Sequence, residues 1–315
     1  MSAKRIIADG YVSTFLPFSG FPRIESTGKV TLKTGENYRE MMASPDEHFY
    51  ISWGVPAQGV RHAVIETGFF WDSAHCDFNG LYEDCSLNRP EARSIVESFN
   101  APVSACQLFA DGKLRTKMRQ PATGKPEWTG VVIAGQYHND RSIKRVGSTE
   151  DYHRFIEETC RHYGKRALLK IHPVLFGNAQ ERELLYGIAQ KHGCEVGFFD
   201  LDIVNKAEFV VTYNSTCTID CLLRGKHVVT YAPGYFWKAG VAQYSNRQMP
   251  GDIMPADPAY VGKFLDFVVW RYCFNTRSHE RYLAKILETF SQSDELFPLP
   301  PELSYGAYVT SDLSK

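Results

Sequence analysis

The sequence predicts a two-domain α/β protein whose C-terminal half is built on a parallel sheet. From about Trp128 onward, short β-branched runs bounded by turn residues alternate with amphipathic stretches of helical length. The chain has 315 residues, which is enough for two domains that each bury a core. Its composition, 43% hydrophobic and 23% charged, is that of a folded globular protein, so we expect structure nearly throughout.

The first predicted domain covers residues 1–125. Strands are expected at His48–Trp53 and His62–Glu66, and a helix is expected at Arg89–Phe99. Thr116–Trp128 combines prolines, glycine and polar residues as linkers do, and this places the boundary.

The second predicted domain covers residues 126–275 and is followed by a helical and irregular tail at 276–315. Right-handed crossovers would bring its strands into one sheet, with ligands at their carboxyl ends. The expected strands are 131–135, 167–171, 195–199, 209–213 and 227–231, and the expected helices are near 150–163, 179–192, 215–224, 257–273 and 277–291.

The charge balance and the apolar runs narrow the class of protein. The 35 basic and 36 acidic residues give a formal net charge of -1, which argues against affinity based mainly on phosphate contacts along a nucleic acid. Runs such as 131–134 are too short to cross a bilayer, and Asp9 interrupts the N-terminal segment before a signal sequence develops. Eight cysteines without a C-x-x-C pair predict reduced, packed thiols, a cytoplasmic location and no metal site.

A histidine and a proline follow the strand that ends at Ile171. Pro173 stops the strand and forces a turn, which leaves His172 facing the edge of the sheet near Lys170. The imidazole can hydrogen-bond or pair with a phosphate or a leaving group. A histidine that merely ends the strand is the competing interpretation.

Asn214, Ser215 and Thr216 follow the strand that ends at Tyr213 and are expected to open a helix. Free N–H groups and the dipole of a helix start favour an anion there. Capping alone also explains Ser215 or Thr216.

Two carboxylates are candidates for the chemistry. Gln136 and Asp140 follow the strand that ends at Gly135, and Asp140 can act as nucleophile or base, or as a turn or N-cap residue. In the first domain, Glu66 ends a strand beside Gly68, which permits close approach. An exposed glutamate at a turn is the alternative.

Taken in order, these motifs resemble a known family. The series is Glu66-Thr67-Gly68-Phe69, Gly80-Leu81-Tyr82, Gly135-Gln136 with Asp140 and Ser142, Lys170-Ile171-His172-Pro173, and Val211-Thr212-Tyr213-Asn214-Ser215-Thr216 through Gly225-Lys226-His227-Val228. Over about residues 45–275 it resembles the capsule polysaccharide synthesis family, whose members include bacterial β-Kdo transferases. The resemblance implies a GT-B-type fold, in which two Rossmann-like domains face each other across a cleft.

The resemblance also implies roles for residues. His172-Pro173 and Asn214-Ser215-Thr216, with Gln136 and Lys170, would hold a CMP-activated sugar, and His172 would assist its departure. Asp140 would act at the anomeric carbon, and Glu66 falls on the first acid of a Glu-Asp-Gly-like motif of the family. Because the acceptor hydroxyl needs a base, we expect Glu66 to serve as one. Thr67 replaces the second acid of its motif and the linking regions are short, which leaves the sugar and the acceptor open.

The predicted function is metal-independent glycosyl transfer from a nucleotide sugar to a carbohydrate acceptor, with no cofactor. One alternative is a bacteriophage enzyme that adds a sugar such as arabinose or glucose to a hydroxymethylated base in DNA. It would need a basic groove on the first domain, for which the available residues are Arg89, Arg93, Lys113, Arg115, Lys117 and Arg119. The second alternative is a nucleotide-sugar-binding protein without activity.

Overall fold

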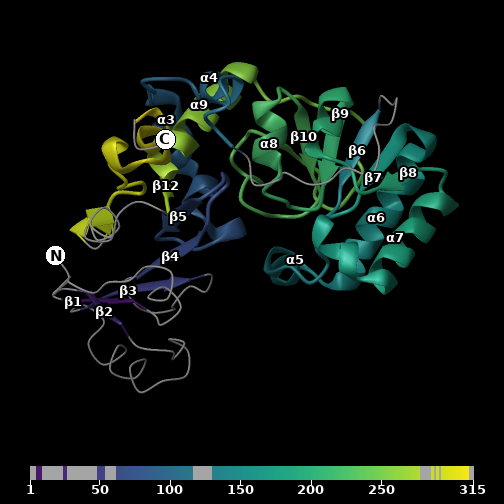
Figure 1. The fold of residues 1–315 in the computed structure, drawn as a ribbon, viewed down its shortest axis with the longest axis horizontal. Coiled ribbons are helices and arrows are strands. Elements are labelled where there is room, and N and C mark those ends of the chain that lie inside the picture. The colour runs from purple at the N-terminus through teal and green to yellow at the C-terminus, as the bar shows by residue number, and fades with distance from the viewer. Residues whose placement is uncertain are drawn as a thin grey trace. The chain divides into compact units, whose positions relative to one another are not determined.

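The computed structural model describes residues 5–8, 24–26, 48–53, 62–115, 130–276, 285–286, 289–290 and 292–311 (Figure 1). The chain divides into two compact units. The first unit combines Met1–Arg115 with Asp266–Lys315, and the second unit is Thr116–Leu265. The last part of the chain therefore belongs with the first unit, whereas the sequence suggests a separate tail from residue 276. The predicted linker and nearly all of the predicted helix 277–291 lie outside the described residues.

The second unit is built on a six-stranded sheet in which every neighbouring pair is parallel. The strands are β6 (Val131–Ala134), β7 (Ala167–Lys170), β8 (Glu195–Gly197), β9 (Phe209–Thr212), β10 (His227–Thr230) and β11 (Gln243–Tyr244). All five predicted strands are present, and the short edge strand β11 is the one that the sequence pattern misses. The order β11-β10-β9-β6-β7-β8 reverses direction between β6 and β9, as in doubly wound nucleotide-binding folds.

Helices or 3₁₀ turns connect the strands of the second unit from β6 to β10, and the last helix, α9, runs from this unit into the first. The helices are α5 (Arg141–Val146), α6 (Thr149–Tyr163), α7 (Ala179–Lys191), α8 (Thr218–Leu223) and α9 (Pro258–Phe267), with 3₁₀ turns at Gly164–Arg166, Pro173–Gly177 and Leu201–Lys206. Helix α6 begins with a reciprocal capping box between Ser148 and Asp151. The predicted helix 257–273 is instead α9 followed by a π-helical turn, Val268–Tyr272.

The start of α8 corrects a prediction. The helix begins at Thr218 and not at Asn214 or Ser215, and its N-cap residue, Cys217, makes no side-chain capping bond. The hydroxyl of Ser215 accepts a hydrogen bond from the backbone N–H of Cys217 at 3.2 Å. This local bond closes a turn before the helix, which is how serine side chains compete with helical pairing.

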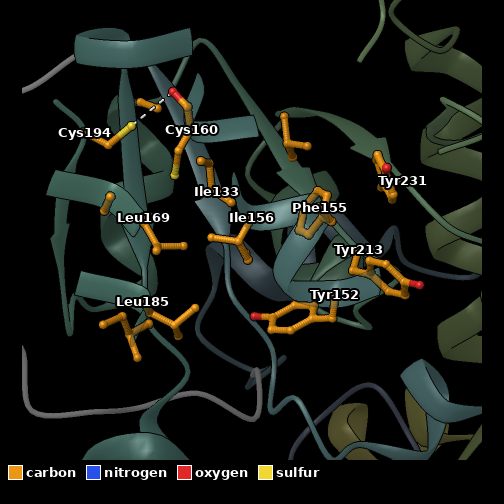
Figure 2. Close-up of a cluster of buried hydrophobic side chains, with 14 of the residues drawn as sticks. Ile133, Tyr152, Phe155, Ile156, Cys160, Leu169, Leu185, Cys194, Tyr213 and Tyr231 are labelled. Atoms are coloured by element: carbon orange, nitrogen blue, oxygen red, sulfur yellow. Dashed lines mark hydrogen bonds between the residues drawn. The ribbon is translucent and has the colours of Figure 1, made fainter. Parts of the chain in front are cut away.

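The core of the second unit lies on one face of its sheet, under α6 and α7 (Figure 2). Ile133 and Leu169 point into it from neighbouring strands, and Tyr152, Phe155 and Ile156 meet them from α6. Because side chains alternate along a strand, Leu168 and Lys170 face the opposite side. Near the carboxyl edge of this sheet, one face therefore carries the apolar core and the other carries the charged side chain of Lys170.

The first unit contains a mixed sheet with the order β12-β5-β4-β3-β1-β2. Its strands are β1 (Arg5–Ala8), β2 (Ile24–Ser26), β3 (His48–Trp53), β4 (His62–Thr67), β5 (Ser73–Asp77) and β12 (Cys273–Asn275). Its α-helices and 3₁₀ turns include α3 (Pro90–Ser98), α4 (Ala105–Ala110), α11 (Tyr305–Thr310), Tyr82–Asp84, Ser86–Asn88 and Pro301–Leu303. The predicted strands at 48–53 and 62–66 and the predicted helix at 89–99 are confirmed. The α/β class with parallel sheets is confirmed as well.

Among the described residues, no helix combines the length and the hydrophobicity that crossing a bilayer requires. All eight cysteines are free thiols, and all except Cys106 are buried. Their packing agrees with the sequence-based expectation of small buried side chains.

Candidate functional site

The point where the strand order reverses lies between β6 and β9. The chain leaves these two parallel strands at Gly135 and Tyr213, so the loops that begin there share one edge of the sheet. The loop that begins after β7 at Ile171 is next to them, because β7 pairs with β6. Loops after β6, β7 and β9 therefore bring Asp140, His172 and Ser215 to the edge where doubly wound folds bind ligands.

Gln136 and Asn214 bond to each other at this reversal. The Gln136 amide nitrogen donates to Asn214 Oδ1 at 3.0 Å, and the Asn214 backbone N–H donates to Gln136 Oε1 at 2.9 Å. Asn214 Nδ2 also donates to the backbone carbonyls of Ser142 and Pro233, both at 2.9 Å. We call Gln136, Ser142, Tyr152 and Asn214 the closed cluster.

Tyr152 completes the closed cluster from α6. Its hydroxyl accepts from the Gln136 backbone N–H at 2.8 Å and donates to the Gln136 carbonyl at 3.0 Å. Gln136 and Asn214 are only 5% and 4% exposed, so their hydrogen bonds are made to protein groups and not to solvent. The closed cluster therefore ties the loops after β6, β9 and β10 together.

Close backbone approach at this edge requires two glycines. A Cβ atom on Gly234 would lie 2.9 Å from Asn214 Cβ, and a Cβ on Gly135 would lie 2.7 Å from the Lys170 carbonyl oxygen. Real Cβ atoms do not sit at such distances, so any larger residue would push the loops apart.

Asp140 is the N-cap residue of α5. Its Oδ1 accepts a hydrogen bond from the Ser142 backbone N–H at 2.8 Å. The side chain is partly exposed, and within the described part of the chain Oδ2 has no hydrogen bond. The capping interpretation thus holds for one oxygen, and the second oxygen remains available to a ligand.

His172 caps the 3₁₀ turn Pro173–Gly177 that the proline was expected to force. Its Nδ1 accepts from the Val174 backbone N–H at 3.3 Å, so a neutral ring carries its proton on Nε2. Burial and the nearby Lys170 lower the pKa of His172 to about 4, while Asp140 opposes this shift. At neutral pH His172 is therefore an uncharged donor close to both Asp140 and Lys170.

Lys170 ends β7 on the face opposite the hydrophobic core and is 5% exposed. Burial lowers its pKa, and the nearby Cys217, Asp200, Cys221 and Asp220 act in the opposite direction. In the described ranges its ammonium group forms no hydrogen bond or ion pair. A buried cation in this state favours an anionic partner.

Asp220 is a site residue that the sequence pattern did not single out. It lies on α8, is 3% exposed, and acts electrostatically on Lys170. Its position two residues into a short helix looks like ordinary first-turn acid placement, which is why the pattern alone did not distinguish it.

Ser215 and Thr216 are half-buried in the turn before α8. Backbone N–H groups of Thr218 and Ile219 donate to the carbonyls of Ser215 and Thr216, at 3.3 and 3.1 Å. With Cys217 N–H held by the Ser215 hydroxyl, the N–H groups of this turn are largely occupied. The Thr216 hydroxyl forms no hydrogen bond with any described residue.

Asp140, Lys170, His172 and Thr216 share one property: each keeps a polar atom without a hydrogen bond among the described residues. We call these four residues the open cluster. They come from the end of β7 and from the loops after β6, β7 and β9, beside the closed cluster.

Glu66 belongs to the first unit. It is the penultimate residue of β4, and its Oε1 accepts hydrogen bonds from the Thr67 backbone N–H at 2.8 Å and the Thr67 hydroxyl at 2.9 Å. A Cβ on Gly68 would lie 2.3 Å from Ser73 Oγ, so the glycine is needed where β4 turns into β5. The glycine thus allows the chain's own backbone to pass close to Ser73.

No group of three or more histidine, cysteine, aspartate or glutamate side chains within the described residues could hold a metal ion.

Known structures resemble this chain over most of its length. The Thermosulfurimonas dismutans KpsC β-Kdo 2,7 transferase matches with a TM-score of 0.60 and 16% identity, covering 86% of this chain and 92% of that one. The β-Kdo 2,4 transferase of the same KpsC matches with a TM-score of 0.54 and 14% identity, covering 87% and 93%. The chain has the KpsC β-Kdo transferase fold. The resemblance to β-Kdo transferases that the motifs indicate is confirmed at the level of fold.

The KpsC fold is found by structure and not by sequence. No family model and no curated protein sequence matches the chain.

Proposed function

We propose that the chain is a glycosyltransferase that uses a nucleotide-activated sugar, with a CMP-Kdo-like donor bound at the open cluster. The supporting observation is that three complementary groups lie where the strand order of a doubly wound sheet reverses. Lys170 is a buried cation, His172 is a neutral imidazole that can donate a hydrogen bond, and Asp140 has one carboxylate oxygen without a hydrogen bond among the described residues. The KpsC fold supports the same reaction class.

The proposed chemistry divides between these groups. Lys170 would stabilise the phosphate of the donor, and His172 would donate from Nε2 to the departing phosphate oxygen. The Thr216 hydroxyl and the Ser215 turn would contact the same phosphate. Asp140 would act at the anomeric carbon through Oδ2, while Oδ1 stays fixed by the start of α5.

On the acceptor side, the proposal names one residue. Glu66 stays the predicted base for a carbohydrate hydroxyl, and this role depends on the GT-B arrangement, which likewise stays a prediction. Metal independence and the absence of a cofactor are also predictions. Gln136 and Asn214, named with the donor site from the sequence, are proposed to hold the loops rather than the donor, because the closed cluster uses their polar atoms.

Substituting Asp140→Asn tests the proposal. Asparagine is as good an N-cap as aspartate, so α5 should keep its start while the reacting oxygen is lost. Release of CMP from CMP-Kdo should fall by about a thousandfold, and the affinity for CMP measured by calorimetry should change by less than about threefold. Turnover at the wild-type rate would remove Asp140 from the mechanism.

The donor itself can be identified by thermal shift. Of CMP-, UDP- and GDP-linked sugars, only the true donor class should raise the unfolding temperature strongly, since ligand at one hundred times its Kd adds about 2.7 kcal/mol. A chain stabilised by a nucleotide sugar that never releases the nucleotide would be the binding protein named as an alternative. The DNA-modifying alternative has less support, because the structures that resemble this chain at a TM-score above 0.5 are β-Kdo transferases; Lys117 and Arg119 of its expected basic groove lie outside the described residues.

A further inference from the structure

A buried carboxylate outside the open cluster lies between two histidines. Glu181, in the first turn of α7, places Oε1 2.8 Å from His153 Nε2 and 3.4 Å from His138 Nδ1. The side chain of Glu181 is 8% exposed. His153 comes from α6 and His138 from the loop after β6, so Oε1 of Glu181 bonds to one of these segments and lies within ion-pairing distance of the other, where the buried His138 Nδ1 has no hydrogen bond among the described residues.

The orientation of His138 supports this junction. The amide nitrogen of Asn139 lies 2.9 Å from His138 Nε2, and an amide nitrogen can only donate. This bond assigns the proton of a neutral His138 to Nδ1, the atom that faces Glu181. The ring of His138 also lies 6.2 Å from that of His153, so both imidazoles converge on the carboxylate.

Glu181 is linked to two of the segments that carry the open cluster, the Asp140 loop and the His172 turn. His138 is two residues before Asp140, whose backbone N–H donates to the Tyr137 carbonyl at 2.8 Å. On the other side, the Glu181 backbone N–H donates to Asn178 Oδ1 at 3.1 Å, and Asn178 N–H donates to the Leu175 carbonyl at 3.0 Å. Leu175 N–H in turn donates to the His172 carbonyl at 3.0 Å.

We propose that Glu181 is a positioning residue that fixes the Asp140 loop relative to the His172 turn through His138 and His153. The inference rests on the proposed function, since it concerns the spacing of two residues assigned to the reaction. Spacing matters because a displacement of about 1 Å can reduce turnover about a hundredfold. Glu181 itself touches neither Asp140 nor His172 among the described residues.

Three variants test the catalytic part. Glu181→Ala should lower CMP release from CMP-Kdo by about tenfold to a hundredfold. Glu181→Gln, which keeps an acceptor oxygen of the same reach, should recover most of that loss, and Glu183→Gln, an exposed position on the same helix, should match the wild type. All three should bind CMP with unchanged stoichiometry. Wild-type turnover in Glu181→Ala, or a loss matched by an equal fall in CMP stoichiometry, would overturn the proposal.

NMR signals of the imidazole rings test whether Glu181 fixes the Asp140 loop relative to the His172 turn, and this test requires no turnover. In protein labelled with ¹⁵N-histidine, Glu181→Ala should shift the ring signals of His138 and of the more distant His172, with assignments from His138→Gln and His172→Gln. Glu183→Gln should shift neither. An unchanged His172 signal would overturn the link. A wild-type chain that releases no CMP would overturn the proposed function instead, and these signals would still decide whether Glu181 couples the two loops.

Discussion

The closed and open clusters lie at the same edge of one sheet and use polar side chains in opposite ways. In the closed cluster, Gln136 and Asn214 are buried, and their side-chain amides form hydrogen bonds with each other's residue and with neighbouring carbonyls. In the open cluster, Lys170 is buried to the same degree but forms no hydrogen bond within the described residues. The contrast teaches that two polar side chains buried to a similar degree at one sheet edge can differ in whether protein groups satisfy them, and the proposed donor site uses those that are not satisfied.

The largest effect on stability is expected in the closed cluster. Asn214→Ala removes the acceptor of the Gln136 amide and the donor to two buried carbonyls, so unfolding should become easier by about 3 kcal/mol. Urea unfolding followed by circular dichroism would measure it. If Asn214→Ala kept the wild-type midpoint but lost CMP binding, Asn214 would belong to the donor site after all.

The open cluster should respond with the opposite sign. Lys170→Met keeps the length of the side chain and removes a desolvated charge, so the free energy of unfolding should stay equal or rise by about 1 kcal/mol. CMP affinity should fall by at least about tenfold, as expected when a charged hydrogen bond to phosphate is lost. Calorimetry and urea unfolding on the same sample give both numbers. A destabilised variant with unchanged CMP affinity would place Lys170 among structural residues.

His172 offers a pH-dependent comparison. Its pKa of about 4 lies below its ordinary value of 6.5, so at pH 5 the unbound ring is mostly neutral. A bound phosphate raises the pKa of a nearby imidazole, and His172 should then take up a fraction of a proton. Binding enthalpies of CMP in buffers with different ionisation heats measure this uptake. His172→Gln is the control, and equal uptake in both proteins would exclude His172 from the phosphate site.

The same lowered pKa predicts the pH dependence of stability. Between pH 6.5 and about 4 the unfolded chain binds a proton at His172 that the folded chain does not, so this contribution to stability is present above pH 6.5 and is lost as pH falls through that window. His172→Gln should flatten the dependence over this range.

The smallest effect is expected at Ser215. Ser215→Ala removes the hydroxyl that accepts the Cys217 N–H, which should cost about 1 kcal/mol of stability. If Ser215 does no more than close this turn, CMP affinity will stay within about twofold in calorimetry. A tenfold loss of affinity would instead move Ser215 into the open cluster.

Much of the second unit could be predicted from the sequence, because its longer strands are short apolar runs, such as VVIA in β6 and FVVT in β9, that end at turn residues. The loops that meet at the carboxyl edge were also predictable, since parallel strands share that edge. The hydrogen bonds that each polar residue makes at that edge could not be predicted from the sequence. Gln136 and Asn214 look like ligand-binding residues in a sequence, and the sequence gives no sign of the hydrogen bonds that they make to each other.

Other features could not be predicted from the sequence, for physical reasons. Ser215 is a favourable N-cap by type, yet its hydroxyl closes a turn and the helix starts later. The pairing of Glu181 with His138 and His153 joins residues far apart in sequence, so no local pattern signals it. The assignment of residues 266–315 to the first unit depends on β12 pairing with β5, a long-range antiparallel contact of the same kind.

That pairing has a consequence for how the protein can be taken apart. The second unit is one uninterrupted stretch, 116–265, inserted into the first, whose sheet is completed only when residues 273–275 return to β5. An N-terminal half expressed without the last residues would expose β5 as an unpaired edge and invite aggregation, whereas the inserted stretch holds every strand of its own sheet. During synthesis on the ribosome, the inserted stretch can therefore complete its sheet while the surrounding one still waits for its final strand.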